Sequence, residues 1–135
     1  MFEIIIVSHG EYAKAMRQSA EMIVGAQEHM QTFGLHPGED VDALREQVFK
    51  AIAKAKEAGD VLVLTDMMSG SPFNVTASAM SELAFHHVAG VNLPMLLEIC
   101  SVRDFTSAEE VRKSIVEQGK TTIIDVNKLM EEVSK

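Results

Sequence analysis

The chain has 135 residues, of which 47% are hydrophobic and 24% are charged, a composition typical of one globular domain with a packed core. Its net charge of −8, with twelve Lys and Arg residues and no basic cluster, argues against nucleic-acid binding. The single cysteine, Cys100, excludes an internal disulfide framework. Glu3 interrupts the first apolar run, and no stretch approaches the roughly 20 apolar residues of a membrane helix. We therefore expect one cytoplasmic domain over residues 1–135.

Strand and helix patterns alternate along the chain. Continuous β-branched runs predict strands buried on both faces, and apolar residues at helical spacing predict helices between them. The expected strands are 2–7, 30–35, 60–65 and 86–91, with a short strand-like run at 121–125. The expected helices are 11–24, 40–58, 74–85, 92–102, 107–119 and 126–133.

Several residues mark where the helices begin. Asp40 or Glu39 is expected to cap the second helix, and Ser107 the fifth. Before the third helix, Ser71 is expected as the N-cap and Pro72 as the first helical residue, because proline needs no N–H partner there.

This alternation predicts an α/β fold with a doubly wound, mostly parallel sheet and helices on both faces. In the strand order 2-1-3-4, the order reverses between strands 1 and 3, and such sheets bind ligands outside the carboxyl ends of their strands at that point. His9 follows the first strand and Asp66 follows the third. We therefore expect these two side chains to face each other across the crevice.

A histidine and a carboxylate in this arrangement have a chemical use. The carboxylate accepts a hydrogen bond from one ring N–H, which fixes the tautomer and leaves the other ring nitrogen as a nucleophile. Gly10 lets the chain turn sharply after His9, and the helix start at 71–74 offers free N–H groups to an anion. The pattern predicts phosphoryl transfer through a phosphohistidine. The structural alternative is a surface histidine and a helix-capping aspartate.

The other histidines carry a weaker signal. His29 and His36 are expected at the surface, and His86 and His87 begin a strand. No pair has the i, i+4 spacing of a helical zinc site, and no cysteine supports one. We therefore predict no metal site from them.

Five strings of the sequence resemble the enzyme IIA domain of the mannose family of the bacterial sugar phosphotransferase system (PTS). They occur in the family's order over residues 2 to about 104. The strings are Ser8-His9-Gly10, Ala20-Glu21-Met22 with Gly25, Pro37-Gly38-Glu39, Asp66 followed by Gly70-Ser71-Pro72-Phe73-Asn74, and Ala89-Gly90-Val91-Asn92-Leu93-Pro94-Met95-Leu96. The last two strings are specific for this family, whereas Ser8-His9-Gly10 alone would be weak evidence for it.

The resemblance implies a phosphohistidine carrier. The family takes a phosphoryl group from the phosphocarrier protein HPr and passes it to the IIB component, which serves sugar uptake through a membrane IIC/IID complex. The resemblance assigns phosphorylation to His9 and the role of orienting carboxylate to Asp66, and it implies that Gly70, Ser71 and Asn74 hold the phosphoryl group. No metal or organic cofactor is implied for this step. The family also forms homodimers that exchange a C-terminal antiparallel strand, for which 121–125 is the candidate.

Two departures from the family pattern lie beside the site. Ser69-Gly70 stands where many relatives have Gly-Gly, so the loop is narrower or gains a hydrogen bond. Met67 and Met68 stand where relatives often have an aromatic residue or proline. These methionines either form an adaptable apolar rim for a partner or pack in the core.

Other functions remain open at this point. A histidine phosphatase needs an arginine before its histidine, where this chain has Ser8, and usually a larger domain. A receiver domain needs an acidic cluster after the first strand, although Asp66 fits its aspartate. Within the family, one branch serves dihydroxyacetone phosphorylation. A non-catalytic ligand-binding regulator is the last alternative.

Overall fold

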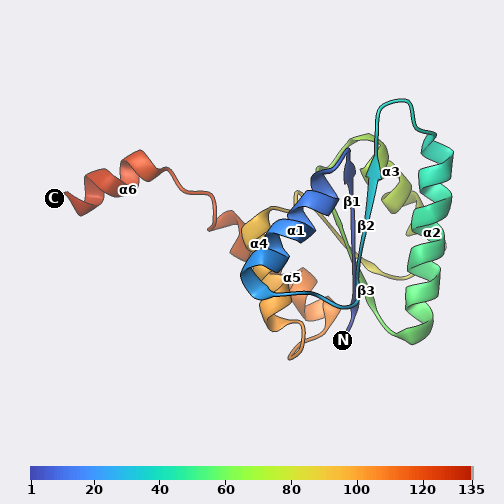
Figure 1. Cartoon of the computed structure of the whole chain (residues 1–135). Helices are drawn as coiled ribbons and strands as arrows, with labels where there is room; N and C mark the ends of the chain where they lie inside the picture. Colours follow the sequence, from blue (N-terminus) through green and yellow to red (C-terminus); the bar gives the residue numbers. More distant parts are fainter. Residues whose placement is uncertain (135) are drawn as a thin grey trace.

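The computed structural model describes residues 1–134, which form a four-stranded sheet and six helices (Figure 1). The strands are β1 (Glu3–His9), β2 (Met30–Leu35), β3 (Val61–Thr65) and β4 (His86–Ala89). The helices are α1 (Tyr12–Val24), α2 (Val41–Ala58), α3 (Gly70–Ala79), α4 (Leu93–Val102), α5 (Ala108–Lys120) and α6 (Val126–Val133).

The sheet has the order β2-β1-β3-β4, and all its strand pairs are parallel. The predicted strand order is therefore confirmed. Because β1 lies between β2 and β3, the chain reverses its winding direction between β1 and β3. Their carboxyl ends consequently lie side by side at the switch point of the sheet.

The central strand is buried on both faces. Ile4, Ile5, Ile6 and Val7 are all 0% exposed, and alternate residues belong to separate apolar clusters on opposite faces of the sheet. Helices α1, α4 and α5 cover one face, and α2 and α3 cover the other (Figure 1). Full burial of one such side chain contributes about 1.5–3 kcal/mol, so this strand is a firm base for the residues that follow it.

Several element boundaries differ from the prediction. β1 runs on to His9 instead of ending at Val7, because Ser8 and His9 pair with Gly34 and Leu35 of β2. β4 ends at Ala89 rather than at residue 91. The expected N-caps Asp40 and Ser107 are confirmed, since each side chain accepts a hydrogen bond from a backbone N–H in the first turn.

The start and the end of α3 were predicted wrongly. Ser69, not Ser71, occupies the N-cap with an extended backbone, so Pro72 is the third helical residue. The N–H groups of a first turn have no partner within the helix, so proline is tolerated there. The helix ends at Ala79 instead of residue 85, because Met80 and the following residues form tight turns. In these turns the Ser81 hydroxyl donates to the Ser78 carbonyl and competes with the helix.

The C-terminal segment departs from the rest of the fold. Thr121 and Thr122 form a turn on the end of α5, and residues 123–125 pair with no strand of the described chain. Helix α6 has no buried residue and extends away from the sheet (Figure 1). The exchanged strand at 121–125 requires a second subunit and stays a prediction.

None of the helices within residues 1–134 has both the length and the apolar character needed to cross a membrane.

Candidate functional site

The carboxyl ends of β1 and β3 bring His9 and Asp66 into contact. His9 is the last residue of β1, and Asp66 directly follows β3. The Nδ1 atom of His9 lies 2.7 Å from Oδ2 of Asp66. Half of the His9 side chain is exposed (49%), whereas that of Asp66 is 11% exposed. The structure thus presents an accessible imidazole on a largely buried carboxylate.

Backbone N–H groups hold the Asp66 carboxylate in one orientation. The His9 N–H donates to Oδ2 at 2.9 Å, and the Met67 N–H donates to Oδ1 at 3.0 Å. An ionised carboxylate only accepts hydrogen bonds, so in the hydrogen bond between Asp66 and the His9 ring the proton is on Nδ1 of His9. The lone pair of the neutral ring therefore lies on Nε2, the nitrogen that points away from Asp66.

Nε2 of His9 faces the first residue of α3. A Cβ atom placed on Gly70 would lie 2.9 Å from both Nε2 and Cε1 of His9, which is closer than real Cβ contacts. Gly70 also has a φ of 86°, a left-handed conformation that glycine adopts without strain. Glycine is thus required here both by the backbone and by the approach of the imidazole.

The N-terminus of α3 is open to an anion. Among residues 1–134, the Ser69 side chain makes no capping hydrogen bond to the helix. The first N–H groups and the positive end of the helix dipole are therefore available next to Nε2. Ser71 is half-buried in this first turn, and Asn74 is exposed one turn further along, four residues after Gly70. Residues four apart share a helix face, so Asn74 lies on the face that carries Gly70.

A buried hydroxyl fixes the turn between β1 and α1. Ser8 is 0% exposed; its Oγ accepts a hydrogen bond from the Ala13 N–H at 2.7 Å and donates to the His9 carbonyl at 3.1 Å. Gly10 has a φ of 51°, and its N–H donates to the Leu35 carbonyl of β2. The sequence analysis did not assign this role to Ser8, and its only signal was a serine between a buried strand and a helix.

An ionic cluster flanks His9 on the β2 side. The two ring nitrogens of His36 each lie 2.6 Å from a carboxylate oxygen, one of Glu11 and one of Glu39. The hydrogen bond with Glu11, followed by that with Glu39, raises the pKa of His36 above its ordinary value. His36 is 44% exposed, as predicted for the surface, but its link between the loops after β1 and β2 was missed.

Exposed apolar side chains follow both site residues in the sequence, Tyr12 after His9 and Met67 and Met68 after Asp66. Met67 is 47% exposed and Met68 is 77% exposed, so these methionines form a rim and do not pack in the core. Tyr12 is 44% exposed, and its hydroxyl donates to the Val91 carbonyl at 3.1 Å. We refer to Tyr12, Met67 and Met68 as the apolar rim.

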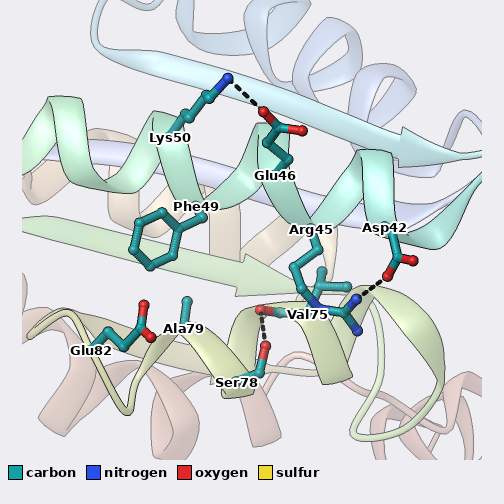
Figure 2. Close-up of a pocket in the computed structure, with 9 residues that line it drawn as sticks. All are labelled: Asp42, Arg45, Glu46, Phe49, Lys50, Val75, Ser78, Ala79 and Glu82. Atoms are coloured by element: carbon teal, nitrogen blue, oxygen red, sulfur yellow. Dashed lines mark hydrogen bonds and ion pairs between the residues drawn. The ribbon is translucent and has the colours of Figure 1, made fainter.

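A groove of about 580 Å³ lies between α2 and α3, away from this site (Figure 2). Phe49, Val75 and Ala79 give it an apolar floor, with charged residues of α2 such as Arg45 along its border. It contains neither His9 nor Asp66. Within the described residues, no three His, Cys, Asp or Glu side chains are grouped as they would be around a metal ion.

The fold and this site define a class of α/β domain, a doubly wound parallel sheet with a histidine–aspartate pair at its switch point. The sequence model of a family described as PTS system fructose IIA component (EIIA-man) matches residues 3–116. The fructose-specific EIIA component of the PTS from Bacillus subtilis is 32% identical over 116 residues, which are 85% of this chain and 80% of that protein. The mannose-specific EIIAB component of Escherichia coli is 36% identical over 119 residues, which are 87% of this chain but 37% of that longer protein.

Solved structures give the same result. The PTS IIA protein associated with the fucose utilization operon of Streptococcus pneumoniae has a TM-score of 0.85 at 30% identity and covers 95% of both chains. An EIIA component from Streptococcus agalactiae has a TM-score of 0.86 at 27% identity, covering 95% of this chain and 99% of that one. The chain belongs to the mannose family of PTS EIIA components, and the resemblance found in the sequence is confirmed. EIIA components are phosphotransferase-type proteins of sugar transport.

Proposed function

We propose that this chain is the phosphohistidine carrier of a sugar phosphotransferase system, which accepts a phosphoryl group from phospho-HPr on His9 and passes it to a IIB component. The observation that carries the proposal is the orientation of His9. Its Nδ1 is bound to Asp66 at 2.7 Å, and its Nε2 faces Gly70 at the N-terminus of α3. An exposed, oriented nucleophile beside an anion site is what a phosphoryl acceptor needs.

The acceptance step uses groups already in place. The Nε2 lone pair of His9 attacks the phosphorus of the donor, a new N–P bond forms, and the N–P bond to the donor histidine breaks. The Nδ1 proton stays on His9, and the ring becomes cationic. Asp66 stabilises this charge through the hydrogen bond that it already accepts. The free N–H groups of α3, with the Ser71 and Asn74 side chains, hold the phosphoryl oxygens.

Partner docking uses the surface around His9 in the same proposal. The apolar rim gives flexible contact area, because methionine adapts its shape to a partner. Glu11 and Glu39, which bind His36 in the loops after β1 and β2, contribute negative charge. We expect partners with an apolar centre and a basic border, and we place the carrier in the cytoplasm.

The proposal includes a homodimer. β4 is an edge strand with one unpaired side. The segment at 121–125 pairs with no strand of the described chain, and Ile123 is 79% and Ile124 56% exposed. An unpaired edge and a detached apolar segment in one chain complement each other across a two-fold axis. We propose that residues 121–125 add to β4 of the partner subunit as an antiparallel strand.

The choice of a sugar system over dihydroxyacetone phosphorylation rests on the relatives. The curated relatives are named as fructose-, mannose- and sorbose-specific components. Half of the His9 side chain is exposed, which favours a protein donor over a small ligand held by a regulator.

The test is the intact mass of the protein after incubation with phosphoenolpyruvate, enzyme I and HPr. We expect one added phosphoryl group that is labile to acid, and no added mass in His9→Ala. His29→Ala is the matched control, because His29 is 55% exposed and lies before β2, at the opposite end of the strands. A folded His9→Ala that still gains an acid-labile phosphoryl group would rule out His9. A wild-type protein that gains none would favour the ligand-binding regulator.

A further inference from the structure

His87 is a partly buried histidine that the site described above does not use. It lies on β4 opposite Val63 of β3 and on the same face of the sheet, the face that α2 and α3 cover. Its Nε2 lies 2.9 Å from Oγ1 of Thr65. On the other side its ring lies against Phe73 of α3, with ring centroids 5.4 Å apart and an interplanar angle of 37°.

These two contacts lie at the two ends of the loop at residues 66–69, which begins with Asp66. Thr65 is the residue immediately before Asp66, and Phe73 lies in the first turn of α3, three residues after Gly70. The loop between them, residues 66–69, has Met67, Met68 and Ser69 exposed, so its own side chains bury little to hold it in place. The imidazole of His87 is thus a direct bridge between the two ends of this loop.

The Thr65 end of the bridge is firmly held. Thr65 is 0% exposed, and its carbonyl accepts hydrogen bonds from both the Gly90 and Val91 N–H groups.

Burial lowers the pKa of His87 to about 4, so its ring is neutral at physiological pH. A neutral ring can both hydrogen-bond to a hydroxyl and pack against Phe73 without the cost of a buried charge.

We propose that His87 is a positioning residue, which sets the placement of Asp66 relative to the N-terminus of α3 by bridging Thr65 and Phe73. The inference rests on the proposed carrier function for its kinetic consequence. The hydrogen bond and the ring contact of His87 go to Thr65 and Phe73, so it acts through Asp66, the residue after Thr65, and through the start of α3 at Gly70. The chemical consequence is the tautomer of His9, because the hydrogen bond to Asp66 is what favours the proton on Nδ1.

The neighbouring histidine provides a matched control. His86 lies on the same strand but on the opposite face, where its Nε2 is 2.9 Å from Asp60 and its Nδ1 accepts from Arg112. Asp60 lies just before β3, at the end of the sheet opposite His9. His86→Leu and His87→Leu therefore make the same chemical change at adjacent positions, and only the second removes the bridge.

The first measurement is the His9 ring tautomer, read from ¹⁵N chemical shifts of the full-length, unphosphorylated protein. Wild type and His86→Leu are expected to keep the Nδ1–H form. Thr65→Val and His87→Leu are expected to populate the Nε2–H form, and Thr65→Ser, which keeps the hydroxyl, is expected to restore the wild-type spectrum. This readout needs no phosphoryl donor, so it tests the bridge even if the carrier function fails.

The second measurement is the single-turnover rate of phosphoryl acceptance from phospho-HPr. Misplacement of reacting groups by a fraction of an ångström is costly, so we expect Thr65→Val and His87→Leu each to lower this rate about tenfold. The double variant is expected to be no slower than either single variant, because both remove one contact. Folded Thr65→Val and His87→Leu proteins with wild-type rates and tautomers would overturn the proposal, as would an equal effect of His86→Leu. Should His87→Leu not fold, Thr65→Val against Thr65→Ser decides alone. Failure of wild-type acceptance would count against the carrier function, not against the bridge.

Discussion

The carboxyl edge of the sheet and the C-terminal segment at residues 121–133 differ in what they leave without a partner. The polar groups of the sheet edge have hydrogen-bond partners, whereas the apolar side chains of the C-terminal segment are exposed. At the sheet edge, each oxygen of the Asp66 carboxylate accepts a backbone N–H, and the buried Ser8 hydroxyl both accepts and donates. In the C-terminal segment, Ile123 and Leu129 are exposed apolar side chains, and no residue of α6 is buried.

The difference matches the proposed division between a site that one chain forms and a segment that, in our proposal, a second subunit covers. The His9 site is assembled from β1, the residue after β3 and the N-terminus of α3 of a single chain. The C-terminal segment leaves apolar surface uncovered, which is typical of a region that is buried on assembly. Substitutions in the first region are expected to change chemistry, and substitutions in the second to change association.

The largest effect in this comparison is expected from Asp66→Asn. An amide oxygen carries no charge to stabilise the cationic ring of phospho-His9, and the amide N–H₂ can face Nδ1 and favour the wrong tautomer. We expect the rate of phosphoryl acceptance to fall roughly 100-fold, which is the scale seen when one group that stabilises developing charge is removed. Rapid-quench kinetics with phospho-HPr measures this rate. Asp42→Asn on α2, where the carboxylate is 83% exposed, is the control. Equal rates for wild type and Asp66→Asn would remove Asp66 from the mechanism.

Gly70→Ala is expected to combine a chemical and a structural effect. Its Cβ would lie 2.9 Å from the His9 ring, so the ring must move, and we expect about tenfold slower acceptance from this displacement. The left-handed backbone costs about 1–2 kcal/mol in stability for a residue with a Cβ.

Gly38→Ala separates these two effects. Gly38 has a φ of 82°, and nothing lies within 4 Å of an added Cβ. It should therefore lose similar stability in denaturant unfolding while its acceptance rate stays at the wild-type value. An acceptance rate in Gly70→Ala that matches Gly38→Ala would show that the contact with His9 has no kinetic role.

The C-terminal segment gives the next prediction. Ile123→Asp is expected to convert the proposed dimer to a monomer, because a carboxylate at an interface position would be buried without a partner. Light scattering should then give half the wild-type molar mass, while His9 still accepts phosphoryl groups. Met22→Asp is the control, since Met22 on α1 is 87% exposed and lies outside the segment. An Ile123→Asp protein that stays dimeric would place the interface elsewhere.

The smallest expected effect is the pH dependence contributed by His36. Its pKa is raised above 6.5 in the folded chain, so its stabilisation is fully present below that value and is lost as pH rises through the folded pKa. Hydrogen bonds from His36 lower the pKa of Glu39 from 4.5, so the stabilisation that Glu39 contributes to the fold is lost as pH falls through its folded pKa. The cluster of His36, Glu11 and Glu39 should therefore stabilise the folded chain most between pH 4.5 and 6.5.

Thermal unfolding of His36→Gln measures this contribution. We expect its Tm to lie below that of wild type at about pH 5.5, and the gap to shrink at about pH 8.5. His29→Gln is the control, because His29 is also an exposed histidine near a glutamate, at a distance of 3.4 Å. A gap that widens with pH would contradict the sign derived for His36.

The sequence alone predicted the parts of this molecule that depend on local pattern. Buried β-branched runs located β1 and β3, and alternation with helices predicted the parallel order that placed His9 beside Asp66. The start of α3 was missed because Ser69 and Ser71 are equally good N-caps by composition, so the local sequence does not distinguish them. The contacts of His36 and His87 join residues far apart in the chain, so no local pattern could reveal them.

The central claim is that Asp66 holds Nδ1 of His9 and leaves Nε2 as the nucleophile. The most direct test is to identify the phosphorylated ring nitrogen by ¹H–¹⁵N and ³¹P NMR of the protein after transfer from phospho-HPr. The account predicts phosphorylation at Nε2, with the Nδ1 proton still bound to Asp66. Phosphorylation at Nδ1 of His9 would contradict it, because that nitrogen cannot be both the donor to Asp66 and the attacking atom.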